Sequence, residues 1–169
     1  MANAFLSTES WQQVVARTLP LFGHRNWIVV ADSAFPQSSR SGTRTIVADT
    51  DQAHAVQTVL SGIEESWHLR PKIYLDSELD LLTDEDASGI EKYRDWLTEK
   101  LKAFPVEWQP HEKIIATMSS VAEQFQVLVL KSHMQLPYTS VFIELHCGYW
   151  DGKAEEKLRR KMASAERVV

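Results

Sequence analysis

Short apolar runs rich in β-branched residues alternate along this chain with segments whose apolar side chains recur at helical spacing. The clearest run, Asn-Trp-Ile-Val-Val-Ala at residues 26–31, is typical of a strand buried on both faces of a sheet. After Asp51, by contrast, Val56, Leu60 and Ile63 fall on one face of a helix. Strands that alternate with helices are typical of layered α/β folds. The sequence therefore predicts an α/β layered sandwich with a mostly parallel sheet.

The other elements follow from the same periodicities and from cap and turn residues. Thr83 followed by Asp86 matches a helix-capping pattern, and Trp67 continues the apolar face of the second helix. Strands are expected at residues 26–31, 44–49, 71–75, 106–108, 125–130 and 139–145. Helices are expected from Ser7 or Thr8 to about Leu19, from Asp51 through Trp67, from Thr83 to about Phe104, and from Pro110 onward.

The first 150 residues contain no repeat, low-complexity tract or linker, so residues 1–150 are expected to form a single domain. Residues 151–169 have a different character because they are highly charged. Within them Glu155 and Arg159, and likewise Glu156 and Arg160, are spaced for ion pairing on a helix. We expect a charged C-terminal helix or tail.

Composition excludes several functional classes. The net charge of −5 is unlike that of proteins that follow the nucleic-acid backbone, and no apolar stretch reaches the roughly 20 residues of a membrane span. The first residues lack the charged start and apolar centre of a secretion signal. The single cysteine, Cys147, can form neither an internal disulfide nor a multi-cysteine metal site. A cytoplasmic protein with no nucleic-acid or membrane partner is expected.

Motifs for nucleotide or metal chemistry are absent from the sequence. It contains no GxGxxG, no GxxxxGK[ST] and no HExxH. Six acidic residues lie between Asp76 and Asp86, but their spacing is not that of a calcium loop, and such runs are usually solvated. No metal and no cofactor are expected.

Two candidate residues flank the first strand. His24 follows a glycine in the turn before it, and Asp32 comes just after its carboxyl end, where open α/β sheets place ligands. A carboxylate there can accept a hydrogen bond from a polyhydroxy ligand or orient an imidazole. The alternative is a solvated His24 and an Asp32 that closes its own turn through an Asx bond. Spacing alone favours this alternative.

Further candidates follow later strands. His111 lies in a first helical turn directly after a strand, where it either faces the ligand edge or is a surface residue. Tyr138 offers an aromatic ring and a hydroxyl, and Thr139 and Ser140 add small hydrogen-bonding groups that suit a sugar. The alternative for this segment is a capped turn that leads into the last strand.

Three blocks of the sequence together resemble the D-ribose pyranase and L-fucose mutarotase family, over about residues 10–150. The first block is Leu21-Phe-Gly-His24, then the strand Trp27–Ala31, then Asp32-Ser-Ala-Phe-Pro36. The second runs from Val106 to His111-Glu112. The third is Pro137-Tyr-Thr-Ser140 with the apolar residues that follow it. The first block is fairly specific, and the other two support it by their order.

The resemblance implies a three-layer α/β/α sandwich with a mixed sheet, assembled into homo-oligomers that are often rings, such as a decamer, with active sites near subunit contacts. It also implies cofactor-free interconversion of the ring forms or anomers of a monosaccharide. By match, His24 takes the catalytic proton-donor position, and Asp32, His111, Tyr138, Thr139 and Ser140 take sugar-binding positions.

Some positions depart from the family pattern. Ser140 stands where the family has asparagine, and the longer segment Ser132–Leu136 replaces a Gly-Glu pair. His111 stands where fucose-type members often have arginine, which favours ribose-like sugars. Because the changes surround the expected sugar position, the alternative function is a sugar-binding or regulatory homologue without turnover.

Overall fold

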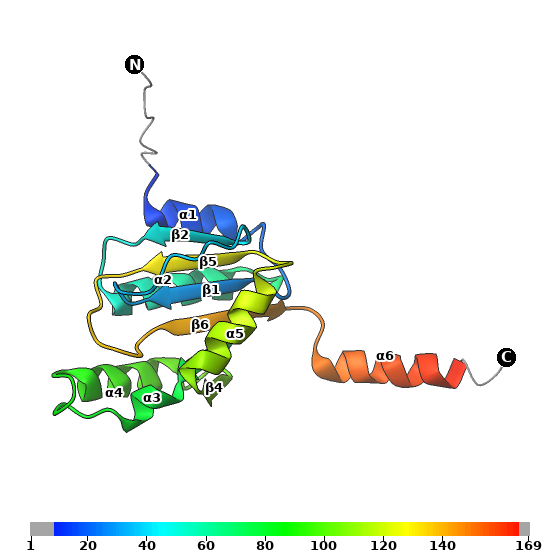
Figure 1. The fold of residues 1–169 in the computed structure, drawn as a ribbon. Coiled ribbons are helices and arrows are strands. Elements are labelled where there is room, and N and C mark those ends of the chain that lie inside the picture. Colours follow the sequence, from blue (N-terminus) through cyan, green and yellow to red (C-terminus); the bar gives the residue numbers. More distant parts are fainter. Residues whose placement is uncertain (1–8, 166–169) are drawn as a thin grey trace, which may run out of the picture.

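The computed structural model describes residues 9–165, and within them the chain forms a six-stranded mixed sheet with strand order β2-β5-β1-β6-β3-β4 (Figure 1). The strands are β1 (Trp27–Ala31), β2 (Thr43–Val47), β3 (Leu69–Asp76), β4 (Val106–Gln109), β5 (Val127–Lys131) and β6 (Val141–Cys147). The helices are α1 (Trp11–Thr18), α2 (Gln52–Glu65), α3 (Ser77–Leu81), α4 (Ile90–Leu101), α5 (His111–Val121) and α6 (Gly152–Ala165).

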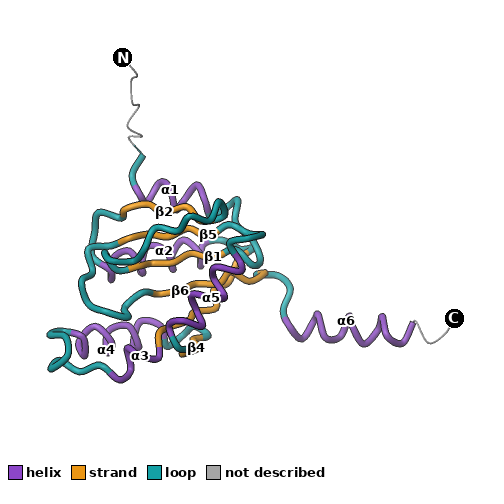
Figure 2. Tube along the Cα trace, viewed as in Figure 1, coloured by secondary structure: helices purple, strands orange, loops and turns teal. Residues whose placement is uncertain are grey.

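The sheet is parallel except for β6. Strand β1 pairs with β5, β2 with β5 and β3 with β4 in parallel, whereas β6 runs antiparallel to both β1 and β3. Its first residue, Val141, therefore lies opposite Val30, near the carboxyl end of β1. Figure 2 shows the loop between β5 and β6 on that same side of the sheet. The last loop is thus brought to the carboxyl edge, where α/β sheets bind ligands.

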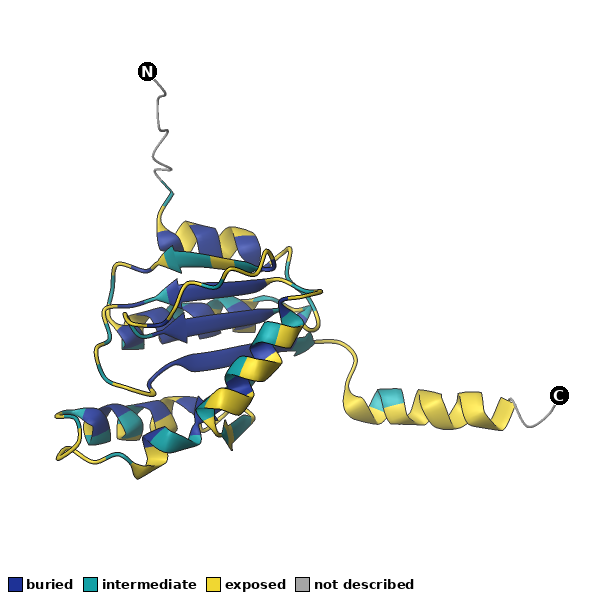
Figure 3. Ribbon diagram, viewed as in Figure 1, coloured by how far each residue is buried: buried dark blue, intermediate teal, exposed yellow. Residues whose placement is uncertain are grey.

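Helices cover both faces of the sheet, so the prediction of a three-layer α/β/α sandwich is confirmed. Side chains of β1 alternate between two cores: Ile28 and Val30 pack with α1, α2 and α4, whereas Trp27 and Val29 pack with α5. Every residue of β1 is buried, as the apolar run predicts, and Figure 3 shows the central strands in dark blue.

The structure corrects three expectations about helices. Thr83 and Asp86 close a turn, because the backbone N–H of Thr83 donates to Asp86 Oδ2 over 3.0 Å, and α4 begins later, at Ile90. Trp67 is 79% exposed, since α2 ends before it. At the N-terminus, Ser10 caps α1 by accepting from the backbone N–H of Gln13, and the predicted caps Ser7 and Thr8 lie outside the described residues.

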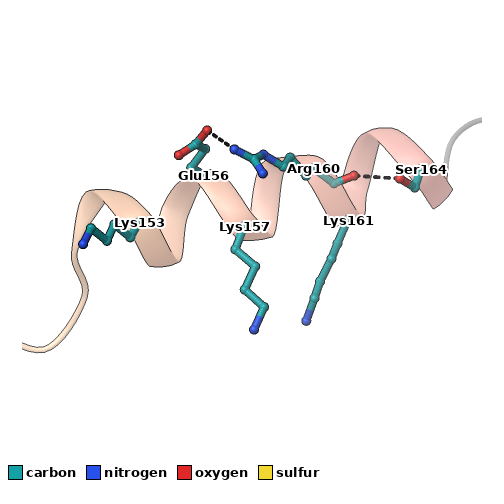
Figure 4. Close-up of a pocket in the computed structure, with 6 residues that line it drawn as sticks. All are labelled: Lys153, Glu156, Lys157, Arg160, Lys161 and Ser164. Carbon is teal, nitrogen blue, oxygen red and sulfur yellow. Dashed lines mark hydrogen bonds and ion pairs between the residues drawn. The ribbon is translucent and has the colours of Figure 1, made fainter.

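Helix α6 extends away from the sheet and has no buried residue (Figure 1). Both expected ion pairs form, Glu155 with Arg159 at 2.7 Å and Glu156 with Arg160. Figure 4 shows Lys157 and Lys161 pointing away from the second pair. The charged segment is therefore a solvated helix. Over the part of the chain that the structure describes, no helix is both long and apolar enough to span a bilayer.

Candidate functional site

Polar side chains gather at the carboxyl edge of the sheet, where β1, β3 and β4 end and β6 begins. The main-chain register explains this, because Asp76, the last residue of β3, pairs with Gln109, the last residue of β4. Pro110 then turns the chain, and His111 opens α5 beside Asp76. The residues of this group, called here the edge cluster, are Asp32, Asp76, His111, Tyr138 and Ser140.

Asp32 has two roles in the fold. The backbone N–H of Ala34 donates to its Oδ1 over 2.9 Å, which closes the Asx turn expected from the sequence. The hydroxyl of Ser140 donates to its Oδ2 over 3.1 Å. The turn therefore holds the carboxylate toward the start of β6, in contact with a second residue of the edge cluster.

His111 is fixed on several sides. Its Nδ1 lies 3.0 Å from Asp76 Oδ1, and its backbone N–H is shared between the two oxygens of Glu78 at 3.1 Å. Its ring meets the ring of Tyr138 edge-to-face, with centroids 5.6 Å apart. The imidazole keeps 29% of its surface exposed, so it remains accessible from outside the fold.

Asp76 is the functional candidate that the sequence analysis missed. It was included in a solvated acidic run, yet its side chain is fully buried. Burial, together with repulsion from Glu78 and Asp32, raises the pKa of Asp76 to about 6, although the contact with His111 acts in the opposite direction. The signal that could have found it is positional, because Asp76 ends β3 much as Asp32 follows β1.

Buried polar groups hold the Tyr138 segment in place. The amide of Gln52 donates to the carbonyl oxygens of Val30 and Thr139 over 3.1 and 2.9 Å, and the Tyr93 hydroxyl donates to the Thr139 carbonyl over 2.8 Å. Tyr138 itself is 40% exposed and has a φ of 56°. A short loop thus presents an aromatic ring in a conformation that few residues other than glycine adopt.

Thr139 does not present its side chain to the surface. It is fully buried, and its hydroxyl donates to the carbonyl of Leu136 over 2.8 Å. The hydroxyl that was expected to contact a sugar is therefore bonded within the loop instead. Its structural contribution is the carbonyl oxygen that anchors the loop.

His24 lies at the opposite edge of the sheet from the other candidates. The whole of β1 separates it from Asp32, and five strand residues span about 17 Å. The structure does not bring His24 to the edge cluster within one chain. The sequence could not reveal this separation as a difficulty, because the two residues are only eight positions apart.

An open cavity of about 560 Å³ surrounds His24. Its lining includes two arginines and a second histidine as well as two carboxylates. Arg25 Nε donates to His24 Nε2 over 3.3 Å, and the rings of His24 and His146 lie 5.9 Å apart. The charged and imidazole groups around it are His24, Arg25, Arg70, His146, Asp151 and Glu155.

Comparison with solved structures shows three similar folds. Bacillus subtilis RbsD complexed with D-ribose matches with a TM-score of 0.55 at 18% identity, over 79% of this chain and 91% of that one. The fucose mutarotase of Streptococcus pneumoniae in complex with L-fucose matches with a TM-score of 0.54 at 16% identity, over 81% and 92%. FucU from Bifidobacterium longum matches with a TM-score of 0.51 at 15% identity, over 79% and 92%.

No family model and no curated protein sequence matches the chain. At identities below 20%, the likeness to the three solved structures establishes a shared fold. This shared fold confirms, at the level of the fold, the resemblance expected from the sequence.

Proposed function

We propose that this protein is a cofactor-free monosaccharide mutarotase or pyranase that interconverts the ring forms or anomers of a sugar such as ribose or fucose. The observation that carries the proposal is the edge cluster, which gathers Asp32, His111, Tyr138 and Ser140 at the carboxyl edge of this fold. Two of the structures with the same fold hold D-ribose and L-fucose.

The reaction needs two proton transfers and nothing else. One group protonates the ring oxygen while another removes the proton of the anomeric hydroxyl. The C–O bond of the ring breaks, and the electron pair of the O–H bond forms the carbonyl of the open sugar. Closure reverses these steps, on either face of the carbonyl or with a different hydroxyl. Imidazole is suited to both transfers near neutral pH.

The edge cluster offers suitable sugar contacts. The partly exposed carboxylate of Asp32 would bond sugar hydroxyls, and the buried Ser140 hydroxyl would hold that carboxylate in place. The exposed ring of Tyr138 would pack on the apolar face of the sugar. His111 would hold the substrate or share the proton transfer. Because a histidine rather than an arginine occupies this position, we expect ribose-like sugars to be preferred.

His24 would act as general acid from a second copy of the chain. Its cavity is open and carries Arg25 and Arg70 beside Asp151 and Glu155, whereas the edge cluster carries the carboxylates of Asp32 and Asp76 and no arginine or lysine. These two edges are different surfaces, so their contact would be head-to-tail, and such contacts form a ring when the rotation between copies closes. A homo-oligomer with sites shared between copies is therefore part of the proposal.

Backbone strain occurs in both parts of the proposed site, the His24 cavity and the edge cluster. Within residues 9–165, the non-glycine residues with positive φ are Arg25, at 76°, and Tyr138, at 56°. Such residues persist only where the surrounding structure enforces them, and they concentrate at functional sites. One of them is adjacent to His24, and the other belongs to the edge cluster.

Exchange NMR tests the proposal. Saturation transfer between the ring forms of ribose, and separately of fucose, should be faster with catalytic amounts of the protein than in buffer. Replacement of His24 by alanine should slow the exchange by about 10²–10⁴-fold, as expected for loss of a general acid.

The control for that substitution is His54→Gln, since His54 lies exposed on α2 and packs on Trp11. This variant should exchange the sugar as fast as the wild type. Exchange that survives His24→Ala unchanged would contradict the assignment of His24.

A sugar-binding or regulatory protein without turnover is the second candidate. One observation favours it, namely that the Ser140 hydroxyl is already bonded to Asp32 and is shorter than the asparagine amide of the family pattern. Calorimetric binding of ribose or fucose, with no acceleration of exchange, would favour this candidate over the enzyme.

A further inference from the structure

His111 and the buried Asp76 form a pair that can supply the second proton transfer of the proposed reaction. Asp76 Oδ1 lies 3.0 Å from His111 Nδ1, whereas Nε2 of the same ring has no hydrogen-bond partner among the described residues. We propose that Asp76 is a positioning residue that holds His111 with Nδ1 protonated, so that Nε2 accepts the proton of the anomeric hydroxyl. This inference rests on the proposed function and adds a residue to it.

Asp76 has no other partner in the described part of the chain. It occupies the N-cap position of α3, but its side chain makes no capping hydrogen bond there. No lysine or arginine pairs with it, and its single ion-pair contact is with His111. Its second oxygen, Oδ2, is buried without a hydrogen-bond partner. The interactions of this carboxylate therefore point to His111 alone.

The rest of the histidine is also held. Both oxygens of Glu78 accept from its backbone N–H, which fixes the start of α5. The rings of Tyr138 and Phe142 meet its ring edge-to-face, at 5.6 and 6.3 Å between centroids. The backbone N–H, the two sides of the ring and Nδ1 of His111 are therefore all in contact with other groups, and Nε2 is the nitrogen left free among the described residues. The side chain is 29% exposed.

The fold gains little from a carboxylate in this place. A fully buried acid with an unpaired oxygen is unfavourable, and burial raises the pKa of Asp76 to about 6. An asparagine of the same size would avoid the cost of a buried charge. A buried charge that contacts a single imidazole is the arrangement that orients a catalytic histidine in other enzymes.

The proton balance of the step is complete. His111 Nε2 takes the proton of the anomeric hydroxyl as the ring C–O bond breaks, and the ring oxygen receives the proton of His24. The imidazolium formed at His111 is stabilised by the Asp76 carboxylate, which keeps its own charge. When the ring closes, Nε2 returns its proton to the carbonyl oxygen and His24 recovers the other, so no co-reactant is needed.

Asp76→Asn tests the inference, with Asp80→Asn as the control, because Asp80 is an exposed carboxylate four positions later in the chain. Exchange at saturating ribose should fall by about tenfold or more in Asp76→Asn, with sugar affinity by calorimetry changed less than about twofold. Asp80→Asn should match the wild type in both measurements.

The nitrogen-15 NMR spectrum of His111 shows which ring nitrogen carries the proton. A purely structural role of Asp76 would leave this protonation unchanged. In the wild type the proton should reside on Nδ1, and in Asp76→Ala the ring should lose this preference. A folded Asp76→Asn variant that exchanges sugar at the wild-type rate would overturn the inference, as would a wild-type His111 protonated on Nε2.

Sugar exchange and the protonation of His111 are measured separately. A wild-type protein that accelerates no sugar exchange refutes the proposed function, and the spectrum of His111 then decides whether Asp76 positions the ring. Normal exchange in the wild type with an unaffected Asp76→Asn refutes the positioning role alone.

Discussion

At the scale of single residues, Asp76 links stability to pH in an unusual direction. Its pKa is 3.8 in an ordinary environment and about 6 in the fold, because burial disfavours the charged form. Well below pH 3.8 the carboxyl is protonated in both the folded and the unfolded state. As the pH rises from 4 through 6, the unfolded chain loses this proton first, so this group lowers the free energy of unfolding over that range.

Asp76→Asn should therefore make the protein more stable at pH 7.5, by up to about 3 kcal/mol, and the gain should shrink as the pH falls from 6 to 4. Urea unfolding at a series of pH values measures this difference. A variant less stable than the wild type at pH 7.5 would show that the contact with His111 outweighs the cost of burial. A stabilised variant with slower sugar exchange would display a trade between stability and activity.

Individual residues also explain why the site could be predicted only in part from the sequence. Asp32, His111 and Tyr138 were found because each follows or precedes a recognisable strand. Asp76 was missed because five further acidic residues follow it closely, and burial cannot be read from such a run. The separation of His24 from the edge cluster depends on the length of β1, not on any residue type.

At the scale of elements, α6 is the part that the sheet does not support. It has no buried residue, and its largest apolar side chains, Leu158 and Met162, are 39% and 45% exposed. Replacing both by alanine should change the free energy of unfolding by less than about 0.5 kcal/mol, because neither side chain packs on the body.

The matched control is Leu97→Ala in α4, where the side chain is buried, and it should cost about 2–5 kcal/mol in chemical unfolding. If the double substitution in α6 proved as costly as the control, α6 would have to pack on another surface in solution.

Helices and strands could be predicted from the sequence where a single pattern dominated. The apolar run of β1 and the cap Asp51 of α2 gave strand and helix starts within one residue. The start of α4 was placed too early because Thr83 and Asp86 have the same spacing in a turn as in a capping box. Only the tertiary context, in which α3 precedes the turn and Gly89 has a φ of 91°, distinguishes the two.

At the scale of the whole molecule, the two ends of β1 carry the two halves of the proposed site. A single chain has the edge cluster at one edge of its sheet and His24 in a cavity at the other. Copies of the chain must therefore meet head-to-tail, so that each site takes one histidine from each of two chains.

Mixing two inactive variants tests this claim most directly. His24→Ala and His111→Ala should each exchange ribose slowly, because each removes one proton-transfer group. When the two chains are coexpressed in equal amounts, about a quarter of the sites in mixed rings should pair an intact His24 with an intact His111. Exchange NMR should then recover a matching share of the wild-type rate, whereas a mixture as slow as either variant alone would contradict a site shared between chains.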